Sequence, residues 1–125
     1  MAASFVIPAD YGGSIKVKKI TSSGLVLTAT AVGSSGFTLP TGAVVVGGWI
    51  DVRVAETNSI KTANIGPTGA VTGFASGIDV SAVTQVKLGG TFPYMNAGGK
   101  EIIINSVTNA HATAVFDLYL EYLEQ

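Results

Sequence analysis

The sequence predicts an all-β protein: an antiparallel two-sheet sandwich, jelly-roll-like, with an extended N-terminal arm. Val, Ile and Thr dominate the chain, and Gly, Asn, Ser and Pro interrupt it at short intervals, as in short strands joined by turns. No window of about 11 residues or more keeps the 3.6-residue apolar period of a helix. About eight or nine strands result, which is typical of a sandwich or a barrel, and we favour the sandwich.

The chain is expected to form one domain behind the arm. Its 125 residues fit a single domain. Residues 1–14 contain Pro8, Gly12 and Gly13 and show no alternation of apolar and polar residues, so they are predicted to be the arm. Residues 15–125 are predicted to form a single β-sandwich domain, because no linker or convincing repeat divides them.

Three strands are predicted in the first half of the domain. Residues 15–20 (IKVKKI) form the first and carry a dense basic patch. Residues 25–32 (LVLTATAV) form the second, since their β-branched content favours a strand. The segment 32–36 (VGSSG) is predicted to be a turn, and Pro40-Thr41-Gly42 a tight turn in which proline fixes φ.

The third of these strands, residues 43–54, has the clearest alternation. One face is predicted to hold Val44, Val46, Gly48, Ile50, Val52 and Val54, and the other Trp49, Asp51 and Arg53. The adjacent glycines at 47 and 48 indicate a bulge or the close approach of another backbone.

The second half is predicted to contain shorter strands and one long terminal strand. A strand at 60–65 is closed by Gly66-Pro67, and short strand pieces are predicted at 70–74, 78–80 and 84–88. A loop follows at 91–100. The last two strands are predicted at 101–107 and 112–123 and are joined by residues 108–111. In the terminal strand Ala112, Ala114, Phe116, Leu118, Leu120 and Tyr122 face one way. Asp117, Tyr119 and Glu121 face the other, and form a surface or a subunit contact unless a neighbouring strand supplies cations.

The composition predicts a component of an assembly. Charged residues make up 12% of the chain, against about 25% in a typical soluble domain, while 47% of the residues are hydrophobic and mean hydropathy is +0.48. A monomer so poor in charge would be sticky, so we expect other protein chains to cover much of its surface.

The apolar runs, the N-terminal residues and the net charge argue against a membrane, a secretory signal and nucleic acid. The longest apolar run, residues 43–50, is far shorter than the roughly 20 residues of a membrane helix. The N-terminus lacks a basic n-region, and Pro8 stops its apolar run, so we expect no secretory signal there. A net charge of −1 argues against capture of nucleic acid. We therefore expect no membrane and no nucleic acid as partners, and assembly in a host cytoplasm.

The sequence offers no catalytic or cofactor site. His111 is the single histidine and has no carboxylate near it in sequence, the chain has no cysteine, and the eight carboxylates are scattered. No glycine-rich phosphate motif is present. We predict no enzyme activity, no cofactor and no metal.

Two features are candidates for partner contact. The lysines of the first strand could meet an acidic partner, or could simply form a solvated edge that discourages unwanted sheet pairing. The loop at 92–95 (FPYM) could fold its rings onto the end of the sandwich, contact a neighbouring subunit, or stack on carbohydrate. The predicted contact residues are Phe5, Val6, Ile7, Tyr11, Lys16, Lys18, Lys19, Phe92 and Tyr94.

Three segments together resemble a known family. They are 39–54 (LPTGAVVVGGWIDVRV), 60–66 (IKTANIG) and 112–123 (ATAVFDLYLEYL). The order of a Pro-x-Gly turn, a long alternating strand, a short strand ending in Gly and a final strand ending near Tyr is similar to the head decoration (capsid cement) proteins of tailed bacteriophages. The resemblance implies a protein on the capsid exterior that binds the major capsid protein and itself, often as a trimer, and braces the shell. It carries over no catalytic residues.

Capsid decoration is therefore the expected function, with Phe5-Val6-Ile7 ordering on docking by adding a strand to a neighbour. Two alternatives stay open. One is a tail, collar or head-fibre component of a phage. The other is a carbohydrate- or receptor-binding module centred on Trp49, Phe92 and Tyr94.

Overall fold

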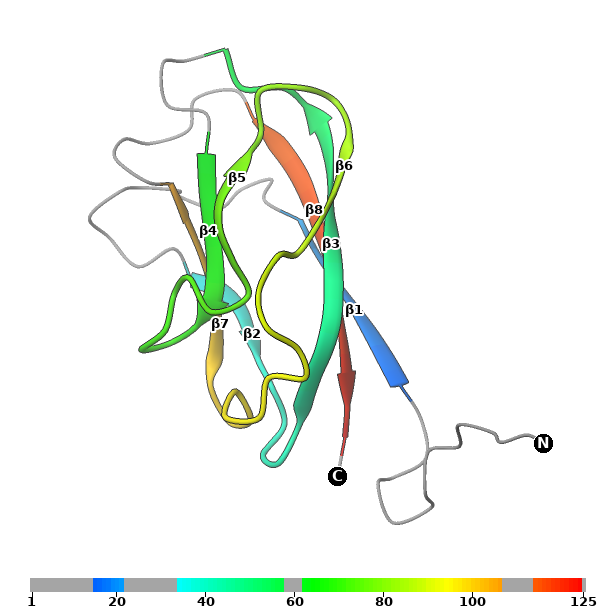
Figure 1. Cartoon of the computed structure of the whole chain (residues 1–125), viewed down its shortest axis with the longest axis vertical. Coiled ribbons are helices and arrows are strands. Elements are labelled where there is room, and N and C mark those ends of the chain that lie inside the picture. The colour runs from blue at the N-terminus through cyan, green and yellow to red at the C-terminus, as the bar shows by residue number, and fades with distance from the viewer. Residues whose placement is uncertain (1–14, 22–33, 58–61, 107–113, 125) are drawn as a thin grey trace, which may run out of the picture.

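The computed structural model describes residues 15–21, 34–57, 62–106 and 114–124, which form two antiparallel four-stranded sheets (Figure 1). The first sheet has the order β1-β8-β3-β6 and the second β2-β7-β4-β5. The strands are β1 (Ile15–Thr21), β2 (Ser34–Thr38), β3 (Val44–Val54), β4 (Thr62–Pro67), β5 (Ala75–Asp79), β6 (Gln85–Lys87), β7 (Glu101–Ser106) and β8 (Val115–Leu123). Among these residues there is no helix that could cross a membrane.

The strand order is that of an eight-stranded jelly roll. Successive strands lie in opposite sheets, except for the β4–β5 pair, and β8 inserts between β1 and β3. The predicted all-β, two-sheet antiparallel sandwich is confirmed, and the structure gives the strand order that the sequence left open. The predicted strands at 15–20, 43–54, 101–107 and 112–123 correspond to β1, β3, β7 and β8.

The core lies between the two sheets and is built from the alternating residues of their central strands. Phe116, Leu118 and Leu120 of β8 are fully buried, as predicted, and face Ile65 of β4 and Ile104 of β7 across the same core cluster. Burying one such side chain stabilises the fold by about 1.5–3 kcal/mol. The outward residues Tyr119 and Glu121 are only half-buried, which fixes the face of β8 that is available to a partner.

A bulge in β3 changes which of its residues face the core. The β3–β8 register shifts between Val45 and Gly47, so Val45 is fully buried while Val46 is half-buried. The prediction that Val46 shares the face of Ile50 was wrong, because the extra residue reverses the alternation. A second shift after Val52 leaves Val54 47% exposed, also against the prediction.

Gly48 confirms the predicted close approach of another backbone. A Cβ at this position would lie 2.3 Å from the carbonyl oxygen of Tyr119 and 2.9 Å from Cδ1 of Leu88. No side chain fits there, so the glycine allows the backbones of β3 and β8 to pair closely.

Four other predicted segments need correction. Residues 34–36 of the predicted turn at 32–36 instead begin β2 (Ser34–Thr38), which pairs with β7 in an irregular register, with Gly36 at φ +76°. Its Ser- and Gly-rich sequence hides a short edge strand. The pieces predicted at 70–74 and 78–80 are replaced by turns and by β5, and β4 continues through Pro67, which pairs with Ile102. Residues 1–14, 25–32 and 108–111 carry predictions that lie outside the described residues.

Candidate interaction surface

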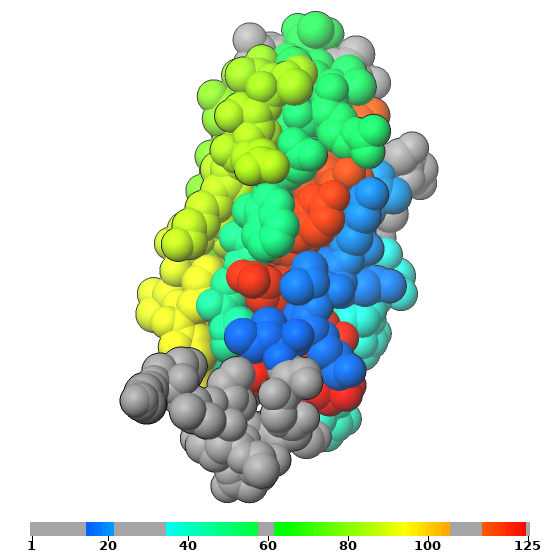
Figure 2. Space-filling view, turned by 90° about the vertical axis from the view of Figure 1, so that its right-hand side faces the viewer, coloured from blue at the N-terminus to red at the C-terminus, as the bar shows by residue number. Residues whose placement is uncertain are grey.

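The outer face of the β1-β8-β3-β6 sheet carries two stacked aromatic rings and a group of charged side chains. This face turns toward the viewer in Figure 2, with β1 in blue, β8 in orange to red and β3 in green. Trp49 of β3 and Tyr119 of β8 are register partners, and their rings stack at 5.0 Å between centroids and 12° between planes. The stack holds the indole in place without any ligand.

One end of this face is organised around a buried carboxylate. Asp117 is only 2% exposed, although it points away from the core. Arg53 of β3 donates a hydrogen bond to its Oδ2 at 3.2 Å, and Nζ of Lys19 of β1 lies 3.7 Å from the same oxygen. Lys19 also lies 6.0 Å from the centre of the Tyr119 ring. The neighbouring strands therefore supply the cations that the outward stripe of β8 needs.

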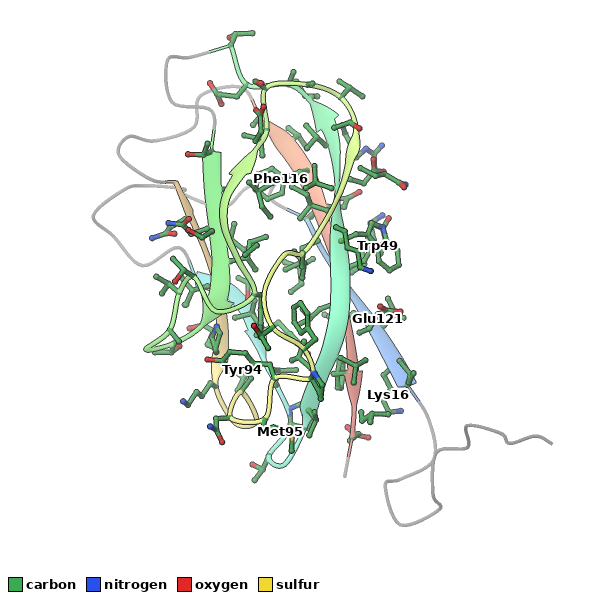
Figure 3. All side chains as sticks on the ribbon, in the orientation of Figure 1. Lys16, Trp49, Tyr94, Met95, Phe116 and Glu121 are labelled. Atoms are coloured by element: carbon green, nitrogen blue, oxygen red, sulfur yellow. The ribbon has the colours of Figure 1, made fainter. Side chains whose placement is uncertain are left out.

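A shallow hollow of about 430 Å³ lies on the same face. It is lined by Val46, Gly47, Gly48, Trp49, Gln85, Lys87 and Glu121. Gly47 adds no side chain to the hollow, and a Cβ there would lie 3.3 Å from Oε1 of Glu121. Figure 3 shows Trp49 and Glu121 on the outer side of the sheet. A second hollow of about 370 Å³ lies between the edge strands β5 and β6.

The three predicted lysines do not form one stripe, because β1 alternates. Lys19 is on the outer face, whereas Lys16 pairs with Glu124 at 3.8 Å and Lys18 lies 5.1 Å from the centre of the Phe37 ring. All three are exposed, and β1 is an edge strand of the described sheet. Contact of these lysines with a partner stays a prediction.

The rings of the 92–95 loop fold back onto the sandwich. Tyr94 meets Phe74 edge to face at 5.2 Å, Phe92 lies 6.1 Å from the same ring, and both are half-buried. The backbone of Tyr94 exchanges two hydrogen bonds with Val45. Met95, by contrast, is 64% exposed (Figure 3). Contact of Phe92 and Tyr94 with a partner stays a prediction.

The three aromatic residues of the carbohydrate alternative are not brought together. Tyr94 and Phe92 pack against the core, whereas Trp49 projects from the outer face of the sheet (Figure 3). Phe5, Val6, Ile7, Tyr11 and His111 lie outside the described residues. Within the described ranges no three His, Cys, Asp or Glu residues are placed to hold a metal ion.

Sequence reasoning missed the hollow beside Trp49. Its members come from three strands, and Gln85 and Lys87 belong to β6, whose pairing with β3 no local pattern reveals. The available signal was the alternation that put Trp49 and Glu121 on outward faces, together with the adjacent glycines at 47 and 48.

The fold matches chains of two bacteriophage capsid structures. A chain of the cyanophage Pam1 capsid asymmetric unit is 20% identical, with a TM-score of 0.65 over 99% of this chain and 94% of that one. A chain of the acid-stable capsid of Helicobacter pylori bacteriophage KHP30 is 15% identical, with a TM-score of 0.64 over 90% of this chain and 89% of that one. No protein-family model and no curated protein sequence matches the chain.

Proposed function

We propose that this protein is a structural component of a bacteriophage particle, and that it decorates the outside of the head. The observation that carries the proposal is the whole-chain similarity in fold to chains of two phage capsid structures, which leaves no large part of either chain unmatched. Fold alone does not determine function, so the proposal also uses the surface chemistry of the chain.

The composition supports a surface that other proteins cover. Charged residues make up 12% of the chain, and several large apolar side chains of the described residues lie in water. These are Ile15, Val17, Val54, Val83 and Met95, which are 47–68% exposed. Covering apolar area stabilises a contact by about 25 cal/mol per Å², and a symmetric shell repeats the same contact many times.

The architecture suits a clamp between neighbouring capsid subunits. Residues 1–14 directly precede β1, an edge strand with exposed Ile15 and Val17. In this proposal the arm binds the major capsid protein by adding a strand to it, and copies of the sandwich associate with one another as a trimer. The protein then lies on the virion exterior after assembly in the host cytoplasm.

A non-catalytic role fits the buried carboxylates. Asp117 is held by Lys19 and Arg53, and Glu56 is 2% exposed and accepts a hydrogen bond from the backbone N–H of Ala114 at 3.0 Å. Both carboxylates therefore have partners within the sandwich. We propose that the protein is not an enzyme.

Co-sedimentation with empty capsids of the phage that encodes the chain tests the proposal. The protein is expected to pellet with the shells, to saturate, and to raise the temperature at which the shells rupture. Bovine serum albumin at the same concentration controls for trapping. Failure to bind shells, or binding only to their interior in a cryo-electron map, contradicts decoration.

A tail, collar or head-fibre position is the competing structural role. It predicts few copies in the particle, whereas decoration predicts a copy number in proportion to the capsid lattice. Densitometry of purified virions, scaled to the major capsid protein, separates the two.

A further inference from the structure

We propose that the hollow beside Trp49 is a binding site for a neutral saccharide. It is the place on the described surface where a pre-positioned aromatic ring and hydrogen-bonding groups of both kinds surround a concave space of about 430 Å³. This site does not depend on decoration, because the hollow is built within a single copy of the sandwich.

The aromatic part of the site is fixed in advance. Tyr119 covers one face of the indole of Trp49 but does not line the hollow. The part of Trp49 that borders the hollow is therefore not the part stacked on Tyr119. A sugar ring presents an apolar C–H face, and contact with an indole that is already held in place orders no flexible side chain on binding.

The polar rim suits hydroxyl groups, each of which both donates and accepts hydrogen bonds. The Glu121 carboxylate accepts, the Lys87 ammonium donates, and the Gln85 amide does both. Lys87 and Trp49 are register partners on β6 and β3, and Gln85 projects to the same side two residues earlier. Gly47 lines the hollow without filling it, since even a Cβ at this position would lie 3.3 Å from Oε1 of Glu121.

The same lining disfavours other ligand classes. One carboxylate and one ammonium offset each other, so the hollow carries no net charge to attract an ion. A phosphate or an acidic sugar would meet the Glu121 carboxylate, and a purely apolar ligand would remove three polar side chains from water without replacing their hydrogen bonds. A neutral, polyhydroxylated ligand satisfies the donors, the acceptors and the ring together.

Tryptophan fluorescence tests the site directly, because Trp49 is the chain's single tryptophan. We would titrate the purified protein with maltohexaose, cellohexaose and chitohexaose, and with sialyllactose as the anionic comparison. We expect a saturable change with at least one neutral oligosaccharide, at a dissociation constant on the order of 1 mM, as for a shallow site. Sialyllactose is expected to bind more weakly than the best neutral sugar.

Matched variants locate the binding. Glu121→Ala is expected to weaken binding about tenfold by removing a charge-assisted hydrogen bond, whereas Glu124→Ala, a carboxylate that pairs with Lys16 outside the hollow, is expected to leave it unchanged. Lys87→Ala is likewise expected to weaken sugar binding, whereas Lys100→Ala, which changes an exposed lysine that does not line the hollow, is expected to leave it unchanged. Melting curves followed by circular dichroism confirm that each variant is folded.

A glycan array with the native protein and with Trp49→Ala or Trp49→Phe extends the test beyond the three oligosaccharides. Signals that need Trp49, and are partly kept by phenylalanine, support the site. Three results overturn it. The first is no Trp49-dependent signal on the array together with no fluorescence change, and the second is sugar binding that is unchanged in Glu121→Ala. The third is loss of capsid binding in Trp49→Ala while no sugar binds to the native protein. The last result would assign this face to a protein partner, and shell binding measured separately keeps the test distinct from that of decoration.

Discussion

Gly48 shows how one missing side chain determines the packing of the central strands. Its position leaves 2.3 Å between an added Cβ and the Tyr119 carbonyl oxygen. Because the obstacle is backbone, it cannot move aside without breaking the β3–β8 ladder. The glycine was recognisable from sequence as a sign of close approach, but the atom it approaches depends on the pairing of distant strands.

We predict that Gly48→Ala lowers the free energy of unfolding by about 3 kcal/mol, because overpacking forces the β3 and β8 backbones apart. Gly89→Ala is the matched control, since an added Cβ there meets no atom within 4 Å, and its effect is expected to be near zero. Urea denaturation measures both. Equal stability of the two variants would contradict the close approach.

Asp117 is a second residue whose role became clear only from its neighbours. Its outward direction was predicted from the alternation of β8, but its burial at 2% depends on Lys19 and Arg53 from the two flanking strands. Each cation is more than half exposed, so each ion pair alone contributes little. Together they keep a buried charge from being left without a partner.

A double-mutant cycle separates the contribution of each ion pair from the cost of leaving Asp117 with neither cation. Lys19→Ala and Arg53→Ala are each expected to cost less than about 1 kcal/mol of unfolding free energy. The double variant is expected to lose about 1 kcal/mol more than the sum of the two, because Asp117 then has neither cation. Additive losses in urea denaturation would show that the two cations act independently.

At the scale of elements, strands with unbroken alternation were predictable and irregular ones were not. β8 could be assigned with its buried face because Phe116, Leu118 and Leu120 alternate without interruption. β2 was missed because Ser and Gly fill it, and its order comes from pairing with β7. The faces of β3 were half right, since the bulge at Val45–Gly47 reverses the alternation. The hollow beside Trp49 was missed for a different reason, because its lining depends on the pairing of β6 with β3.

The arm is the element whose removal tests the proposed tether. Deleting residues 1–14 is expected to weaken shell binding strongly while the sandwich still unfolds cooperatively, because the core of the described residues runs from Ile20 to Tyr122. Co-sedimentation with shells measures the first effect and a thermal melt the second. A truncated protein that decorates shells normally would reject the arm as the tether.

At the scale of the whole molecule, a charge-poor chain has folded into a sandwich that brings charged residues of four strands together on the outer face of one sheet. Asp117, Lys19, Arg53, Glu121 and Lys87 all lie on the outer side of the β1-β8-β3-β6 sheet. Composition predicted that the surface would be short of ions, but not which of the few charged residues would lie side by side. That placement follows from strand order, which no local signal in the sequence reveals.

We predict that the purified protein is a homo-oligomer, with a trimer expected at about three times the chain mass of 12.7 kDa. Sedimentation equilibrium at several concentrations measures the mass. A single copy that stays soluble and does not bind phage particles would contradict both the oligomer and the proposed role.

The pairing of β1 with β8 has a practical consequence. Ile15 and Leu123 are register partners, so the chain enters and leaves the sandwich at the same end. The turn between β5 and β6, which contains Val83, lies at the opposite end (Figure 1). A foreign peptide inserted at that turn would lie far from the start of β1, whereas one fused beyond β8 would lie beside it, so the turn is the better position for displaying cargo without disturbing the proposed tether.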